Sequence, residues 1–310
     1  MKVTDANFDK RILLTQGKEE IYYDSLLIAT GSKCFVPQIK GSEKKGVFTL
    51  RTVEDARQII SFCMDKEKVT LIGGGLLGLE AGYALQKRGK QVTVVEFFPR
   101  LLPRQLDVKG AERLTKRMED MGFSFYLGSS TYEITGDVSV EGVVLSTQEV
   151  IPSEMVIISA GVRPNLELGE SLGLECSRGI CIDSTMRTSR PEVFAAGDVA
   201  EFEQTTYGVW PAAMQQGKVA GVNMAGGSVN YQGSVMANKL KVVGIDLASA
   251  GEIDVENRFK SKIEESETVY KKIVIDDGHI IGCILLGDTS SFNTVTRAIA
   301  EKTVIENVAI

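Results

Sequence analysis

Histidine is nearly absent from this 310-residue chain, and a C-x-x-C motif is missing altogether. The single histidine, His279, argues against a zinc site, because such a site gathers three or four nitrogen or sulfur ligands. The five cysteines are scattered along the chain: Cys34, Cys63, Cys176, Cys181 and Cys283. Scattered cysteines and the lack of a signal peptide predict a cytoplasmic protein in a reducing environment.

An excess of positive charge and long apolar runs are missing as well. The net charge is −6 and the isoelectric point is near 5.2, which argues against nucleic acid as a partner. The longest apolar runs have the length of a strand, so we expect no transmembrane helix and no membrane partner. The 310 residues are enough for two or more globular domains.

The chain does contain a complete dinucleotide-binding pattern between Val69 and Glu96. Strands are predicted at Val69–Ile72 and Val92–Val95, and a G-x-G-x-x-G loop follows the first strand, with glycines at Gly73, Gly75 and Gly78. The helix after this loop should end at a left-handed Gly89, and its buried face is expected from Leu77, Ala81, Ala84 and Leu85. Because all these parts occur in order, nucleotide binding outweighs a simple glycine-rich turn.

Each residue type in this pattern has a chemical reason. Gly73 allows the tight turn, Gly75 lets the backbone approach a pyrophosphate, and Gly78 lets the helix pack close to the strand. The helix N-terminus then offers N–H groups to the phosphates. Glu96 lies 96 − 78 = 18 residues after Gly78, where a ribose-binding acid is expected, and it favours NADH over NADPH. A solvated strand end is the alternative for Glu96, and Arg100 could soften the preference.

Two stretches of the chain resemble each other at an offset of 130 residues. In "IYYDSLLIATGS" and "PSEMVIISAGVRPN", Asp24 aligns with Glu154, and Gly31 aligns with Gly161. Both have an acid, an aliphatic run and a glycine turn, which is typical of a strand in a parallel sheet. In the second unit the loop glycine precedes Gly161 by 161 − 78 = 83 residues, so the first unit's loop would lie near 31 − 83 = −52. We therefore expect the first unit to be incomplete at its N-terminal side and to retain its cofactor weakly.

Four motifs make the chain resemble the pyridine nucleotide–disulfide oxidoreductases: "YDSLLIATGS", "LIGGGLLGLEAG", "ISAGVRPN" and "TSRPEVFAAGDVAEF". The stretches "VEFFPRLLPRQLD" and "LKVVGIDLASAGEI" are similar to the branch of NADH:rubredoxin reductases, NADH oxidases and flavin modules of nitrite reductases. The resemblance covers essentially the whole chain, except for the N-terminal FAD fingerprint of the family. It implies FAD and NAD as cofactors.

The resemblance also implies roles for individual residues. Contacts with the cofactors are expected from Thr30, Gly31, Arg51, Gly161, Gly197, Asp198 and Trp210. Glu80 is similar to a catalytic glutamate beside the nicotinamide and flavin, which in relatives often pairs with an N-terminal lysine. Simpler roles stay open: Asp198 as a turn aspartate, Glu80 as a first-turn helix acid, Trp210 as a packing residue and Arg51 as a surface residue.

The cysteines do not match the disulfide-reducing relatives. Cys176 and Cys181 lie outside the position of the family's redox disulfide, and the C-terminal histidine–glutamate pair of those enzymes has no counterpart here. The resemblance therefore implies a reductase that passes electrons to an acceptor. Rubredoxin, another iron–sulfur protein, nitrite through a partner module and oxygen all stay open.

The expected fold class is α/β, with two interleaved Rossmann-like dinucleotide-binding domains, the first incomplete, and a C-terminal α+β interface domain. The expected boundaries are residues 1–48 and 167–230 for FAD, 49–166 for NAD with a leading helix Val53–Phe62, and 231–310 for the C-terminal domain. In relatives this last domain often makes a dimer, which suggests a homodimer here. Its clearest element is a hairpin from Tyr270 to Leu286, turning at Asp276–Gly278.

Two functions from different classes follow. The first is an NADH-dependent FAD oxidoreductase that passes hydride from NADH to FAD and then electrons to an acceptor. The alternative is an NAD(H)-binding remnant or subunit without independent redox activity.

Overall fold

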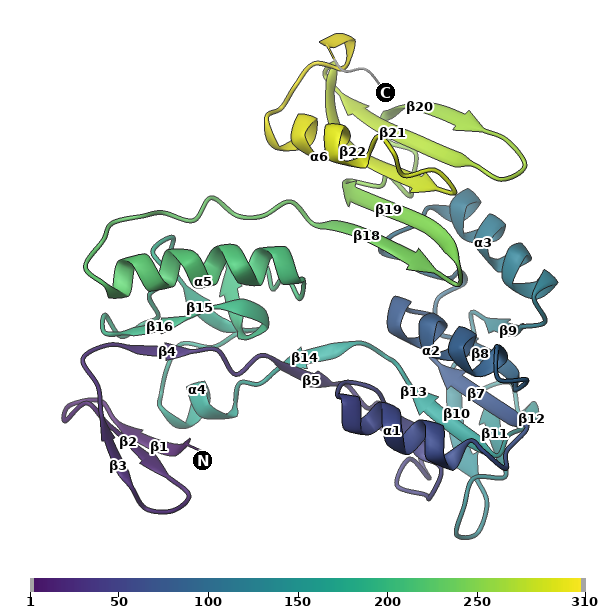
Figure 1. Ribbon diagram of the computed structural model, residues 1–310, viewed down its shortest axis with the longest axis horizontal. Helices are drawn as coiled ribbons and strands as arrows, with labels where there is room; N and C mark the ends of the chain where they lie inside the picture. The colour runs from purple at the N-terminus through teal and green to yellow at the C-terminus, as the bar shows by residue number, and fades with distance from the viewer. Residues whose placement is uncertain (1–2, 308–310) are drawn as a thin grey trace. The chain divides into compact units, whose positions relative to one another are not determined.

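The computed structural model describes residues 3–307, which form two compact units (Figure 1). Unit 1 contains the described residues up to Lys33 together with Val162–Ser234. Unit 2 contains Cys34–Gly161 and the described residues from Val235 onward. Each unit is therefore assembled from two separate stretches of chain, as expected for interleaved domains.

Unit 2 is built on a five-stranded parallel sheet whose strands lie in the order β6 (Val47–Thr49), β13 (Met155–Ile158), β7 (Lys68–Ile72), β8 (Gln91–Glu96) and β9 (Ser124–Leu127). The helices around it are α1 (Val53–Phe62), α2 (Leu76–Gln86) and α3 (Val108–Asp120). Nearly every residue of β7 and β13 is buried, which explains their continuous apolar sequence. The strands and helices predicted for the NAD domain are confirmed to within a residue or two.

Local hydrogen bonds define the ends of the helices around this sheet. Thr52 and Asp55 form a capping box at the start of α1, and Asp107 caps α3 by accepting the N–H of Gly110. Gly89 adopts a φ of +79° just after α2, as predicted for a left-handed C-cap.

The buried face of α2 differs from the predicted one. Leu77 is 54% exposed, and the buried residues are instead Gly78, Leu79, Gly82 and Leu85. A Cβ at Gly82 would lie 2.5 Å from Leu71 of β7. The glycines let the helix backbone approach the sheet, so Gly78 and Gly82 face inward with two leucines, while Leu77 of the predicted face is exposed.

Two further sheets belong to unit 2. One is antiparallel and consists of β10 (Thr131–Thr135), β11 (Gly142–Leu145) and β12 (Val150–Pro152). The other is antiparallel with the order β18 (Ala237–Val242), β19 (Ile245–Gly251), β22 (His279–Leu286), β21 (Tyr270–Asp276) and β20 (Lys260–Glu265). Helix α6 (Phe292–Ala300) packs on this sheet, and the 3-10 helix η2 (Ile305–Asn307) follows it. The predicted hairpin is β21–β22, with Gly278 at a φ of +77° in its turn.

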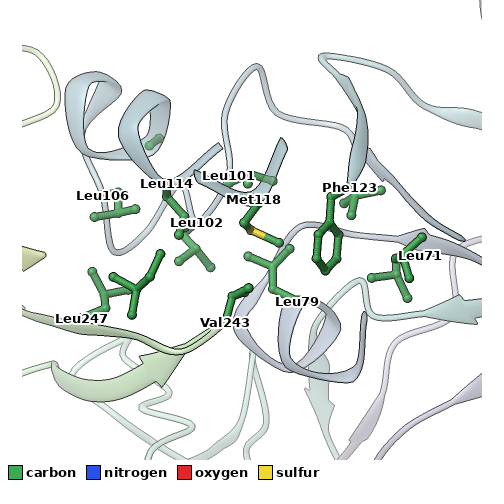
Figure 2. Close-up of a cluster of buried hydrophobic side chains, with 14 of the residues drawn as sticks. Leu71, Leu79, Leu101, Leu102, Leu106, Leu114, Met118, Phe123, Val243 and Leu247 are labelled. Atoms are coloured by element: carbon green, nitrogen blue, oxygen red, sulfur yellow. The ribbon is translucent and has the colours of Figure 1, made fainter. Parts of the chain in front are cut away.

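The boundaries of the compact units differ from the predicted domain boundaries: residues 162–166 and 231–234 lie in unit 1, and two larger differences have a structural cause. Residues 34–48 lie in unit 2, because β6 pairs in parallel with β13. The C-terminal sheet also groups with the five-stranded parallel sheet, because Val243 and Leu247 of the β18–β19 hairpin share one hydrophobic core with Leu79 and Met118 (Figure 2). Packing across sequence-distant segments therefore sets these boundaries.

Unit 1 contains small sheets. They are the meander β1 (Val3–Asn7), β2 (Ile12–Thr15) and β3 (Glu20–Tyr22), and the parallel pairs β4 (Leu26–Ile28) with β16 (Val193–Ala195) and β15 (Ile180–Ile182) with β17 (Ala200–Phe202). Strand β14 (Val162–Pro164) pairs with β5 (Ser32–Cys34). The helices are α4 (Glu167–Ser171), the 3-10 turn η1 (Gly197–Val199) and α5 (Trp210–Met224).

No helix within residues 3–307 is long and apolar enough to cross a membrane.

Candidate functional site

The glycine loop of unit 2 connects β7 to α2, and the fold itself requires two of its glycines. Gly73 has a φ of +110°, and a Cβ there would lie 2.4 Å from the carbonyl oxygen of Ser159. A Cβ at Gly78 would lie 2.7 Å from the carbonyl oxygen of Gly73. Gly161, with a φ of +95°, follows Ser159 in the loop after β13. The structure thus brings three predicted glycines together at the carboxyl end of the sheet.

Gly75 differs from Gly73 and Gly78 because neither its backbone angle nor a crowded neighbour requires a glycine there. Its φ is −82°, and the nearest atom to an added Cβ is the Ser159 carbonyl oxygen at 4.0 Å. Gly75 is also the N-cap of α2, and no side chain caps this helix end. Open space above an uncapped helix N-terminus fits a pyrophosphate, which a side chain would displace. The residues present therefore fit a dinucleotide.

Glu96, the predicted ribose ligand, ends β8 and is 6% exposed. Its Oε2 accepts the N–H of Gly74 at 2.5 Å, and its Oε1 accepts the N–H of Phe98 at 2.8 Å. The carboxylate is thus held at the glycine loop and is no solvated strand end. Each oxygen keeps a second lone pair for a ribose hydroxyl.

Arg100, four residues after Glu96, bonds to the backbone of the loop that follows it. Its guanidinium donates to the carbonyl oxygens of Pro103 at 3.1 Å and Leu106 at 3.3 Å. Arg100 therefore holds the loop that leads into α3, and its effect on a preference for NADH stays a prediction.

In unit 1, the two repeated motifs hold each other. Asn165 donates its side-chain amide to the carbonyl oxygen of Thr30 at 2.8 Å and its backbone N–H to Gly31 at 2.9 Å. The Thr30 hydroxyl returns a bond to the carbonyl oxygen of Asn165 at 3.1 Å. These reciprocal bonds fix the turn at Gly31, which has a φ of +67°. A Cβ added to Gly31 would meet no atom within 4 Å.

Asp198 lies near the Gly31 turn of unit 1, beside Ser32. The hydroxyl of Ser32, which is buried, donates to Asp198 Oδ2 at 2.7 Å. The preceding Gly197 has a φ of +82°, and its N–H bonds to Gln216 Oε1 at 2.8 Å. Parallel pairing of β4 with β16 brings the two turns together, since the carboxyl ends of parallel strands share one edge. Two glycine turns, of which the one at Gly31 is open, and an oriented carboxylate fit the phosphate and ribityl portion of FAD.

The other residues implied by the resemblance lie elsewhere. Trp210 begins α5 in unit 1 and is 78% exposed, so it is not a packing residue within that unit. Arg51 lies in unit 2, where its backbone N–H bonds to Asp55. Glu80 lies on the first turns of α2, and its Oε1 accepts the N–H of Val243 at 2.7 Å. Glu80 thus holds the β18–β19 turn, and its catalytic role stays a prediction.

Sequence reasoning missed three positioning residues: Ser32, Asn165 and Gln216. Ser32 and Asn165 end the two similar motifs, and a polar residue within four positions of each glycine was the available signal. Gln216 lies in the middle of α5, where no local pattern marks it.

All five cysteines lie among the described residues and are free thiols. Burial, and then neighbouring carboxylates such as Glu170 and Glu201, raise the pKa of the Cys176 and Cys181 thiols. A raised pKa disfavours the reactive thiolate, so these two residues are poorly suited to redox exchange. Within residues 3–307, no three His, Cys, Asp or Glu side chains are grouped to hold a metal ion.

Comparison with known proteins decides the family. A family model described as pyridine nucleotide-disulphide oxidoreductase matches residues 1–217, and one described as rubredoxin NAD+ reductase C-terminal domain matches residues 237–303. The chain belongs to the pyridine nucleotide-disulphide oxidoreductase family. The resemblance inferred from the motifs, including its rubredoxin reductase, NADH oxidase and nitrite reductase branch, is confirmed.

Three similar proteins illustrate this family. The chain is 36% identical over 290 residues to an assimilatory nitrate reductase electron transfer subunit of Bacillus subtilis, covering 93% of this chain and 38% of that protein. It is 31% identical over 308 residues to an NADH-rubredoxin oxidoreductase of Clostridium acetobutylicum, covering 99% of this chain and 77% of that protein. A solved NAD-dependent persulfide reductase from A. fulgidus has a TM-score of 0.89 at 26% identity, covering 99% of this chain and 63% of that one.

These likenesses confirm the predicted fold class of Rossmann-like α/β segments with a C-terminal sheet domain. The chain spans less than two fifths of the length of the nitrate reductase subunit.

Proposed function

We propose that this protein is an NADH-dependent flavoprotein oxidoreductase, which passes hydride from NADH to FAD and then electrons to an acceptor. Gly75 carries the proposal, because the open space beside it at a helix N-terminus without a side-chain cap suits a pyrophosphate. Family membership supports the same reading.

The chain's own residues would bind and orient the two cofactors. In unit 2 the first turn of α2 would donate N–H groups to the pyrophosphate of NADH, and Glu96 would accept the ribose hydroxyls. In unit 1 the turns at Gly31 and Gly197 let the backbone come close to FAD, with Asp198 oriented by Ser32. When bound, FAD supplies the redox chemistry by accepting hydride and releasing electrons, while the protein contributes binding and orientation.

NADH should be preferred over NADPH. The buried Glu96 carboxylate would repel a 2′-phosphate, and the neighbouring Arg100 is bonded to backbone carbonyls. Calorimetric titration at one salt concentration should give at least about tenfold tighter binding of NADH, which corresponds to about 1.4 kcal/mol. Equal or tighter binding of NADPH would refute the ribose role of Glu96.

The alternative is an NAD(H)-binding subunit without independent redox activity. It draws support from the NAD-binding residues, which all lie within unit 2. To separate the two, FAD is supplied in excess, unbound cofactor is removed by gel filtration and the visible spectrum is recorded. Bound flavin that NADH bleaches in the absence of oxygen supports the oxidoreductase. A colourless protein that still binds NADH supports the alternative.

The electron acceptor is a separate part of the proposal. The similar proteins are named for rubredoxin, nitrate or nitrite reduction and for NADH oxidation, so rubredoxin, another iron–sulfur protein, a nitrite-reducing module and oxygen are the candidate acceptors. Stopped-flow reoxidation of the NADH-reduced protein by rubredoxin and by oxygen would compare two acceptor classes directly. The homodimer through residues 231–310 stays a prediction, which sedimentation velocity of the purified chain tests.

A further inference from the structure

Strand β20 forms one edge of the C-terminal sheet, and β18 forms the other (Figure 1). It pairs with β21 along its whole length, from Lys260 opposite Ile275 to Glu265 opposite Tyr270. Within the part of the chain that the structure describes, β21 is the only strand paired with β20. An edge strand directs every second N–H and C=O group away from its own sheet, where a further strand can bind them.

The side chains of this edge are displayed on an ordered strand. Most of them are exposed, namely those of Lys260, Lys262, Ile263 and Glu264. Glu265 differs, because Lys109 Nζ lies 2.6 Å and Arg113 Nη2 lies 3.0 Å from its Oε2. These two ion pairs tie the end of β20 to α3. The strand is therefore held in place while an apolar side chain, Ile263, stays 49% exposed at its open edge.

The two faces of β20 differ in character. Successive side chains of a strand point to opposite faces, so Lys262 and Glu264 share one face and Ile263 lies on the other. The Glu264 carboxylate is 3.9 Å from Lys271 Nζ, which has a closer partner in Asp288 at 2.6 Å. Glu264 can therefore form a shorter ion pair with a cation from another chain.

We propose that β20 pairs antiparallel with β20 of a second copy of this chain, about a two-fold axis at Ile263. Residues equally distant from such an axis lie opposite each other, so Lys262 of each copy faces Glu264 of the other. The two Ile263 side chains meet on the opposite face. The order of charges along β20 is thus self-complementary, and pairing joins two five-stranded sheets into one. This inference specifies the surface of the homodimer expected through residues 231–310 and needs neither cofactor.

The other edge of the same sheet provides a contrast. Lys239, Leu240 and Lys241 of β18 are all exposed. The same two-fold pairing, centred on Leu240, would place Lys239 of each copy opposite Lys241 of the other. Like charges opposite each other destabilise a strand pair, and lysines on an edge strand protect it from association. One edge is therefore protected by its charges, whereas the charges of β20 favour a second copy.

The strength of the dimer follows from the size of the contact. Two short strands bury little surface, and interfaces below about 1,000 Å² in total are weak or transient. We therefore expect a reversible dimer with a Kd on the order of 10 µM. Added salt should weaken it, because exposed ion pairs are screened.

Sedimentation equilibrium of the full chain from about 1 to 300 µM tests the pairing. Lys262→Glu and Glu264→Lys each place like charges opposite across the axis, and each should raise the dimer Kd about tenfold or more. An equal mixture of these two variants should form a heterodimer, because the acids of one variant then face the lysines of the other. Lys116→Glu is the matched control, since Lys116 is exposed on α3 and undergoes the same charge change. Circular dichroism verifies that each variant is folded.

The outcomes separate this inference from the other proposals. A wild-type chain that stays monomeric at the highest concentration overturns the pairing and the expected homodimer together. A dimer that neither charge variant weakens overturns the pairing at β20 and leaves a dimer through another surface. Failure of the two variants to associate when mixed overturns the two-fold axis at Ile263. NADH binding by calorimetry should be the same in all variants, so a failure of the proposed function is detected independently.

Discussion

Replacing Lys272 by methionine should destabilise unit 2 by about 3 kcal/mol. Lys272 is 1% exposed and lies on β21. Its Nζ donates to the carbonyl oxygen of Asp254 at 2.7 Å and lies 3.3 Å from Asp107 Oδ2. Asp107 also accepts the hydroxyl of Tyr270 at 2.7 Å. The Lys272 ammonium group therefore links the N-cap of α3 to the C-terminal sheet, and both lie in unit 2.

The size of the stability loss depends on which hydrogen bonds the carboxylates of Asp107 and Asp254 keep after Lys272 is replaced. Removing one partner of a buried ion pair costs about 3–5 kcal/mol, because a charge stays buried without compensation. Here Asp107 keeps the N–H of Gly110 and the Tyr270 hydroxyl, while Asp254 keeps the N–H groups of Arg258 and Phe259. The loss should therefore fall at the lower end of the range, roughly a 100-fold change in the unfolding equilibrium.

Urea unfolding followed by far-ultraviolet circular dichroism measures the loss, and hydrogen exchange of residues 108–120 and 270–286 assigns it to unit 2. Lys271→Met is the matched control, because its partner Asp288 is partly exposed and such pairs contribute about 1 kcal/mol or less. The double variant Lys272→Met/Asp107→Asn should recover part of the loss, since it neutralises one carboxylate and keeps the α3 cap. Equal losses in the Lys271 and Lys272 variants would refute this reasoning.

Three further outcomes are expected. Gly75→Val should abolish NADH binding in calorimetry, because the side chain would occupy the space proposed for the pyrophosphate. The thermal unfolding midpoint should not change, because an added Cβ meets no atom closer than 4.0 Å. Wild-type affinity for NADH would show that the loop is only a turn. The backbone N–H groups of Lys68 and Glu67 hold the pKa of Glu154 below its usual range, so its stabilisation is present above the usual glutamate pKa and is lost as the pH falls through the lower folded pKa. Glu154→Gln should accordingly lose less stability than the wild type as urea titrations move from about pH 5 to pH 3, and parallel curves would contradict this. Burial raises the pKa of Cys283 to about 12, so its thiol should resist iodoacetamide in the native protein near pH 8.5, and rapid labelling identified by mass spectrometry would disprove it.

The elements that could be predicted were those with a local cause. The loop from β7 to α2 was recognisable because Gly73 needs a positive φ and Gly78 needs close packing, and both needs are properties of one short segment. Helix α1 matched its predicted span because the capping box starts it. The buried face of α2 was mispredicted, because hydrophobicity ranks Leu77 above Gly82, whereas the distance to β7 rewards the smaller residue.

The sequence by itself determined the order of strands, glycine turns and acids, and with it the family and the position of the dinucleotide loop. Tertiary structure alone decided which distant residues meet: Ser32 with Asp198, Glu80 with Val243, and the β18–β19 hairpin with the core of the five-stranded parallel sheet. It also decided that Glu96 is buried and held by two N–H groups while the next two rings are displayed. Turns and caps are settled by interactions among neighbours along the chain, whereas burial and side-chain pairing depend on surfaces that exist only after the sheets have assembled.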